Sequence, residues 1–209
     1  MDKTILIVDD SPYIVDGLVA LLKRKGFRPV PAHGGDEALG ILKTTVPDLI
    51  LLDIMMEPMD GWETLERIKT DPATSNLPVL MFSAKKITPE EAQEHRLNIE
   101  DFVSKPVNPS QLLDAIQRIF TRRSEVKQVS ESQMSAGHDA GLVEECAALR
   151  KSIEVDSNLL AVLKRACTLA AAGQEIPQQD VNAIKNLEIK IASDEQRLKE
   201  INGKLDKEA

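Results

Sequence analysis

The sequence predicts an α/β domain with a five-stranded, parallel, doubly wound sheet, followed by an all-α antiparallel helical hairpin. Short apolar runs alternate with longer amphipathic segments across residues 1–122, as expected for parallel strands joined by helices. A polar, serine-rich stretch at 123–139 reads as a linker, whose beginning could extend the preceding helix. Residues 140–209 then carry two long heptad-patterned segments and no strand pattern. These three ranges are the predicted domain organisation.

Five apolar runs are the predicted strands. Those at 4–9, 49–53 and 78–83 lack polar alternation, which is typical of parallel strands buried on both faces. The run at 27–32 contains two prolines, which cannot donate to a ladder, so this strand is predicted at a sheet edge. The fifth strand is predicted at 101–105.

Amphipathic spacing predicts a helix after each strand. Ser11 and Pro12 offer an N-cap residue and a proline at the first helical position, and Gly26 ends that helix. The predicted helices of the first domain are 12–25, 36–43, 62–70, about 89–95, and 109–121.

The predicted hairpin consists of two apolar-striped arms that turn between Gly173 and Pro177. Each stripe has an aspartate in its heptad gap, and Asp156 and Asp194 come level in an antiparallel pairing. Buried together they would repel, so we expect hydration, nearby lysines or a role in fixing the register. His138 lies in the polar linker and is not expected to be a phosphotransfer histidine.

The composition argues against several classes of function. The chain has 209 residues and a net charge of −8, shared equally by the parts before and after Ser124. No basic helix with interleaved aromatics is present, so a nucleic-acid surface is not expected. No apolar run has the length of a membrane span, and no signal peptide is recognised. Cys146 and Cys167 are too far apart along one helix to bond, so we expect free thiols in the cytoplasm.

Polar side chains stand where four of the predicted strands end: Asp9 and Asp10, Asp53, Ser83, and Lys105. Because ligands bind at the carboxyl ends of parallel strands, these groups are predicted to converge in one cleft. Three carboxylates so close together would repel unless a cation joined them, and an oxygen-only set suits Mg²⁺. Each residue taken alone could instead be an ordinary turn or cap residue. Together they favour phosphoryl chemistry with Asp53 as nucleophile.

These residues resemble the receiver domain of two-component response regulators, which is CheY-like and has a flavodoxin-like fold. The resemblance covers about residues 2–122 and rests on the motifs VDD (8–10), LLDIMM (51–56), MDGWE (59–63), FSA (82–84) and FVSKP (102–106). It implies that Asp53 is the phosphoacceptor and takes its phosphoryl group from a histidine kinase. It also implies Mg²⁺ binding by Asp10 and Asp53, by Asp9 mainly through water, and by the backbone carbonyl of Met55.

The same resemblance assigns the residues around the phosphoryl group. Ser83 would hydrogen-bond its oxygens and Lys105 would pair with them, while the small Ala84 leaves room. The peptide between Lys105 and Pro106 is commonly cis in the family. Phe102 takes the place of the aromatic residue that moves on activation.

Three positions depart from the family pattern. Glu57 stands where a proline is usual, four residues after the phosphoacceptor, and the proline follows as Pro58. Phe102 replaces the common tyrosine, and Ser83 the common threonine. The role of Glu57 is not predicted by the sequence.

The sequence therefore predicts a two-component response regulator, not an enzyme with a separate substrate. Its hairpin is expected to form a homodimer or bind a protein target, or to pack on the receiver. No family is recognised in 140–209. One alternative is a DNA-binding helical output, which the acidic charge disfavours. Another is an aspartyl-phosphate phosphatase, which would need a second aspartate where Met55 stands.

Overall fold

The computed structural model describes residues 3–84, 99–135, 140–170 and 178–208. These residues form two compact units that divide in the sequence between Ile116 and Gln117. The helix predicted at about 89–95, the linker end with His138, and the turn between the hairpin arms lie outside the described residues.

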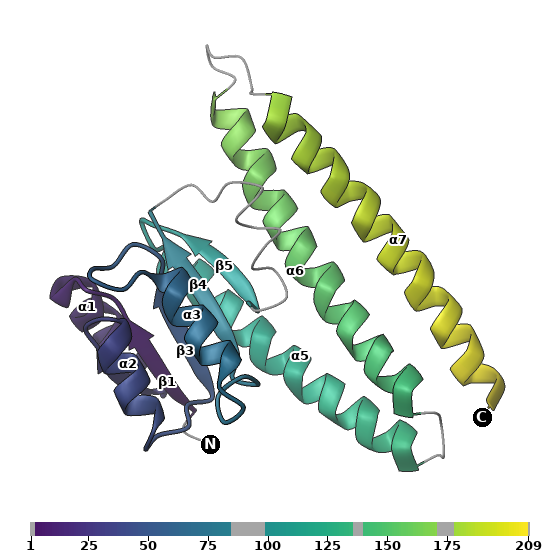
Figure 1. Cartoon of the computed structure of the whole chain (residues 1–209), viewed down its shortest axis with the longest axis horizontal. Coiled ribbons are helices and arrows are strands. Elements are labelled where there is room, and N and C mark those ends of the chain that lie inside the picture. Colours follow the sequence, from purple (N-terminus) through teal and green to yellow (C-terminus); the bar gives the residue numbers. More distant parts are fainter. Residues whose placement is uncertain (1–2, 85–98, 136–139, 171–177, 209) are drawn as a thin grey trace. The chain divides into compact units, whose positions relative to one another are not determined.

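The first unit contains a five-stranded parallel sheet with the strand order β2-β1-β3-β4-β5 (Figure 1). All four strand pairs are parallel. The strands are β1 (Thr4–Val8), β2 (Arg28–Ala32), β3 (Leu49–Asp53), β4 (Val79–Ser83) and β5 (Asp101–Ser104). The predicted five-stranded doubly wound sheet is confirmed.

Burial follows from this strand order. Every residue of β3 and β4 is buried, as expected for central strands with helices on both faces. β2 pairs only with β1 and forms one edge. An edge strand has one side without ladder bonds, so Pro29 and Pro31 are tolerated there and the edge prediction is confirmed.

The helices of the first unit begin and end within one residue of the predicted positions, except at the end of α5. They are α1 (Pro12–Arg24), α2 (Gly35–Leu42), α3 (Gly61–Thr70) and the start of α5 (Pro109–Ser135). Gly26 ends α1 with a left-handed φ of 83°, as its position predicted. Ser11 is the N-cap residue of α1, but its side chain makes no capping hydrogen bond. Asp60 does cap α3, since its Oδ1 accepts a hydrogen bond from the amide of Glu63 at 2.8 Å.

The polar linker predicted at 123–139 is largely helical, because α5 continues to Ser135. The sequence has no glycine or proline between Pro109 and Gly137, and the stretch is rich in glutamate, glutamine, lysine and arginine. These residues are good helix formers even where they bury little. Polarity was therefore the wrong criterion for ending the helix at residue 121.

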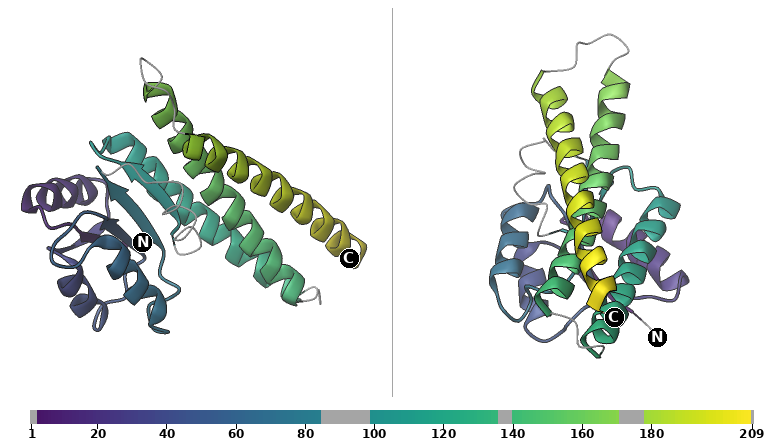
Figure 2. Two further views of the ribbon diagram at one scale, coloured as in Figure 1. Left: turned by 45° about the horizontal axis from the view of Figure 1, so that its top comes forward. Right: turned by 90° about the vertical axis from the view of Figure 1, so that its right-hand side faces the viewer.

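The second unit contains the predicted antiparallel hairpin of α6 (Ala140–Ala170) and α7 (Gln178–Glu208), which lie side by side in both views of Figure 2. Ion pairs fix the pairing: Glu145 with Arg197, and Lys164 with Glu188. An apolar cluster lies between the helices and is made of Val143, Cys146, Ile201 and Leu205, with Leu142, Leu149 and Leu198 packed against it. Cys146 is a free thiol.

The two gap aspartates meet a lysine, one of the outcomes expected from the sequence. Lys190 Nζ lies 2.8 Å from Asp156 Oδ2 and also pairs with Asp194 Oδ2. Ser152 Oγ accepts a hydrogen bond from Lys190 at 2.7 Å and donates one to Asp194 Oδ2 at 3.0 Å. Asp156 is fully buried, so this lysine is the cation that offsets its charge.

Within the described residues, every helix is too short or too polar to span a membrane.

Candidate functional site

The strand order brings the predicted site residues to one edge of the sheet. β1 and β3 are neighbours, with Val8 opposite Leu52, so Asp9 and Asp53 stand side by side at the carboxyl ends. The chain leaves β1 toward β2 on one side, whereas β3 leads to β4 and β5 on the other. This point, where the strand order reverses, is where open α/β sheets bind their ligands.

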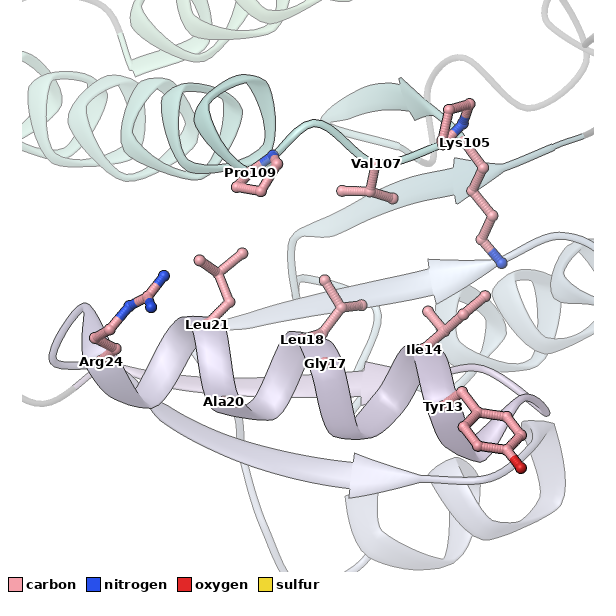
Figure 3. Close-up of a pocket in the computed structure, with 11 residues that line it drawn as sticks. Tyr13, Ile14, Gly17, Leu18, Ala20, Leu21, Arg24, Lys105, Val107 and Pro109 are labelled. Carbon is pink, nitrogen blue, oxygen red and sulfur yellow. The ribbon is translucent and has the colours of Figure 1, made fainter.

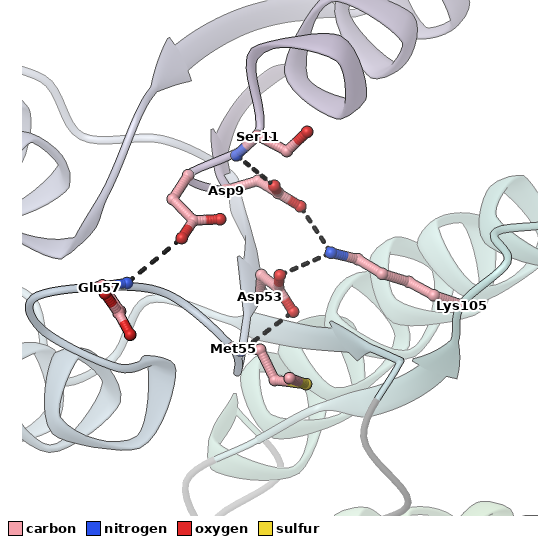
Figure 4. A network of polar contacts seen from close by, with 7 residues as sticks. Asp9, Ser11, Asp53, Met55, Glu57 and Lys105 are labelled. Carbon is pink, nitrogen blue, oxygen red and sulfur yellow. Dashed lines mark hydrogen bonds and ion pairs between the residues drawn. The ribbon is translucent and has the colours of Figure 1, made fainter.

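Lys105 joins the two central carboxylates. Its Nζ donates to Asp9 Oδ2 at 2.8 Å and to Asp53 Oδ2 at 2.6 Å (Figure 4). Asp9 is fully buried and Asp53 is 3% exposed, so neither has bulk water to stabilise its charge. The ammonium also lies 4.8 Å from the centre of the Phe82 ring, within the range of a cation–π contact. Phe82 is a contact that the sequence prediction missed, although it lies in the FSA motif.

Asp9, Asp10 and Asp53 form a cluster of three carboxylates. One oxygen from each lies within 4.8 Å of the others. Burial raises the pKa of Asp9 above its ordinary value, although the hydrogen bonds from Lys105 and from the amide of Ser11 oppose that shift. An all-oxygen set with one member exposed to solvent fits Mg²⁺, which needs few protein ligands and keeps several waters.

Each of the three carboxylates also accepts a hydrogen bond from a backbone amide. The amide of Ser11 donates to Asp9 Oδ1 at 2.8 Å, and that of Met55 donates to Asp53 Oδ1 at 3.3 Å. The amide of Glu57 donates to Asp10 Oδ2 at 3.3 Å. Sequence reasoning missed these donors, because every residue except proline carries an amide and only the fold shows where it points.

Gly61 allows α3 to begin directly against β3. A Cβ built at this position would lie 2.0 Å from the carbonyl oxygen of Asp53 and 2.7 Å from the Cα of Ile54. The amide of Gly61 instead donates to the carbonyl of Ile54 at 2.9 Å. The glycine of the MDGWE motif is therefore a packing requirement for the backbone that carries Asp53.

The remaining predicted residues surround this cluster at different depths. Ser83 ends β4 and is buried, and Ala84 follows it and is exposed. Phe102 lies in β5 opposite Met81 and is 8% exposed. The side chain of Met55 is exposed. The peptide bond between Lys105 and the exposed Pro106 is cis, as is the bond between Glu57 and Pro58.

An apolar groove of about 590 Å³ borders the site (Figure 3). Ile14, Leu21 and Arg24 line it from α1, and Lys105 and Val107 line it from the segment that leads into α5. This groove was not predicted from the sequence, because it forms between two segments that are far apart in the chain. Lys105 belongs to its lining, so the groove reaches the carboxylate cluster.

The chain matches a known protein family in this region. Residues 5–117 match the family described as the response regulator receiver domain. The chain belongs to this family. The two-component response regulator predicted from the sequence is thus confirmed at the level of the receiver domain, and with it the expected flavodoxin-like fold.

The chain is also similar to individual proteins. The receiver resembles the response regulator GtcR of Aneurinibacillus migulanus, with 34% identity over 65% of this chain and 54% of the relative. The chemotaxis protein CheY4 of Vibrio cholerae is 29% identical, with a TM-score of 0.54 over 57% of this chain and 99% of that one. The N-terminal domain of a response regulator receiver protein from Methanoculleus marisnigri JR1 is 61% identical, with a TM-score of 0.49 over 56% of this chain and 94% of that one.

The chain spans about half the length of the first curated relatives that it matches. Its C-terminal part, residues 122–209, matches a different family, described as Metanogen output domain 2. This match was not expected from the sequence motifs.

Proposed function

We propose that this response regulator is switched by phosphorylation of Asp53, with a histidine kinase as the phosphoryl donor and Mg²⁺ as cofactor. The observation that carries the proposal is the position of Lys105 Nζ, 2.6 Å from Asp53 Oδ2 and 2.8 Å from Asp9 Oδ2. A cation so placed can pair with a phosphoryl oxygen once Asp53 carries the group. Family membership supports the kinase as donor.

In the transfer, Asp53 is the nucleophile and requires in-line access to the phosphorus. An oxygen of Asp53 attacks the phosphorus of the kinase's phosphohistidine, so that a P–O bond forms as the P–N bond breaks. The electron pair of the broken bond leaves with the imidazole of the donor. Lys105 then exchanges its contact with Asp53 for one with the phosphoryl group, and the Ser83 hydroxyl donates a second hydrogen bond there.

Asp9, Asp10, Asp53 and the carbonyl of Met55 would hold the magnesium ion. When bound, Mg²⁺ neutralises charge that develops on the phosphoryl oxygens. Without the ion, Lys105 and the amides of Ser11 and Met55 offset the charge of the two buried carboxylates. The outward position of Asp10 leaves the third carboxylate open to solvent and to the ion.

The groove between α1 and the segment after Lys105 is where the donor protein would pack. It is apolar and ends at Lys105, so a helix seated there would present its phosphohistidine beside Asp53. A protein donor can therefore gain binding energy that a small phosphodonor cannot.

The C-terminal unit is proposed as an output module that acts through protein contacts. The description of its matching family as an output domain supports this reading. We propose that the chain self-associates through the hairpin and that the protein is located in the cytoplasm. We further propose that it does not turn over a separate substrate. The net charge of −8 argues against a nucleic-acid partner.

The direct test is Mg²⁺-dependent labelling with a small phosphodonor, read by intact mass. Wild type should gain one phosphoryl group, whereas Asp53→Ala should gain none. Labelling that is equal in the two proteins would exclude Asp53 as the acceptor. Steady release of phosphate from a panel of phosphoesters would instead favour a phosphatase, and salt-sensitive binding of mixed DNA would favour a DNA-binding output.

A further inference from the structure

The three carboxylates of the site are not held equally. Asp9 and Asp53 are buried, and each accepts a hydrogen bond from Lys105 and another from a backbone amide. Asp10 is exposed and does not contact Lys105. In the part of the chain that the structure describes, the donor to its carboxylate is the backbone amide of Glu57, at 3.3 Å.

That donor exists because of the order of two residues. Proline has no amide hydrogen, so the sequence Glu57-Pro58 supplies an N–H at position 57 and removes it at position 58. Asp10 and Glu57 lie on different loops, 47 residues apart in the chain. The hydrogen bond therefore joins the loop after β3 to the loop after β1, across the mouth of the carboxylate cluster.

We infer that the backbone amide of Glu57 is a positioning group for Asp10 as a metal ligand, which rests on the proposed Mg²⁺-dependent function. A hydrogen bond to Oδ2 restricts rotation of the exposed carboxylate and leaves Oδ1 available to the cation. Partners of this kind commonly change metal affinity by about 10–100-fold. Since 3.3 Å is long for an N–H···O bond, the effect belongs near the lower end of that range.

The side chain of Glu57 has no such role. It is exposed, and Figure 4 shows it directed away from Asp53 and Lys105. Its carboxylate is not among the groups of the three-carboxylate cluster. The backbone amide of Glu57, and not its side-chain charge, is therefore expected to affect the affinity for Mg²⁺.

The test is Mg²⁺ titration by calorimetry on the full chain. Glu57→Gln keeps the amide and removes the charge, and its Kd should stay within about twofold of wild type. Glu57→Pro removes the amide hydrogen, and its Kd should rise about tenfold. An unchanged Kd in Glu57→Pro, or equal losses in both variants, would overturn the inference.

A second measurement does not depend on the proline variant folding. In amide NMR spectra of the wild type, the Glu57 proton should move when Mg²⁺ is added, and it should move upfield in Asp10→Ala as the hydrogen bond is lost. A Glu57 proton that is insensitive to Asp10→Ala would refute the inference. If wild type binds no Mg²⁺ by calorimetry, the proposed cofactor itself fails, which is a distinct result.

Discussion

Lys105 is the residue on which the charge balance of the site depends. It lies between two buried carboxylates and is itself only 13% exposed. Its loss would leave Asp9 and Asp53 buried beside each other with no cation, a situation that typically costs about 3–5 kcal/mol. We expect Lys105→Met to lower the free energy of unfolding by roughly this amount in metal-free urea denaturation.

Added Mg²⁺ should restore part of that loss, because the ion can offset the same two charges. The exposed Lys23 on α1 provides the control, since Lys23→Met removes the same charge without uncovering a buried carboxylate. A Lys105→Met protein as stable as Lys23→Met would mean that the ammonium does not compensate the cluster.

The side chains of the site could be predicted from the sequence, whereas its backbone donors could not. The acids and the lysine were predictable because each ends or follows an apolar strand, and the strand ends of a parallel sheet converge. The amides of Ser11, Met55 and Glu57 were not, since their direction depends on loop geometry. Gly61 belongs to the MDGWE motif, but the sequence does not explain why a glycine is needed there. The structure does, because α3 begins against the carbonyl of Asp53 and leaves no room for a Cβ.

Among the elements, the hairpin contains a buried polar layer. Lys190 is the cation shared by Asp156 and Asp194, and Asp156 has no exposed surface. Removing the lysine should therefore destabilise the hairpin by an amount on the order of 3 kcal/mol. We expect Lys190→Met to lower the urea midpoint of the full chain, whereas Lys185→Met, on the exposed face of the same helix, should leave it unchanged.

If this polar layer also fixes the register, replacing Asp156, Lys190 and Asp194 together by leucine should raise stability but permit other pairings. Disulfide trapping of cysteine pairs placed across α6 and α7 would detect them. A triple variant with wild-type pairing would limit the layer to a local stabilising role.

Helix ends were the least predictable feature of the elements. Interior periodicity placed α1, α2 and α3 within one residue, because apolar spacing is dictated by the face that a helix buries. The end of α5 was predicted too early because nothing in its polar extension stops a helix, and residues of good helix propensity continue it to Ser135.

On the scale of the whole molecule, the groove on α1 should distinguish a protein donor from a small one. Leu21→Glu places a charge in the apolar lining. With a histidine kinase that labels the wild type, it should slow transfer about tenfold or more, the cost of roughly 1.4 kcal/mol of lost docking energy. Labelling by a small phosphodonor should not change.

Lys23→Gln makes the same change in net charge on α1 outside the groove, and it should behave as wild type with both donors. An equal slowing with the kinase and the small donor would place the Leu21 effect in the site itself and not in docking.

Self-association is the second expectation for the whole molecule. Ile189 on α7 is 65% exposed, an unusual state for a large apolar side chain on a helix that already has a partner. We expect wild type to have the mass of a dimer by light scattering and Ile189→Glu to shift it toward monomer. Ile189→Leu keeps an apolar side chain of the same size and should remain dimeric, and a monomeric wild type would exclude the proposal.

The sequence by itself determined the receiver fold, the strand ends that carry Asp9, Asp53 and Lys105, and the antiparallel pairing of the hairpin. These features follow from hydrophobic period and chain order, which are local properties of the sequence. The tertiary structure decided which amide reaches which carboxylate, where the groove forms, and which lysine meets Asp156. Such contacts join residues far apart in the chain, so they depend on how loops and helices pack and not on any local pattern.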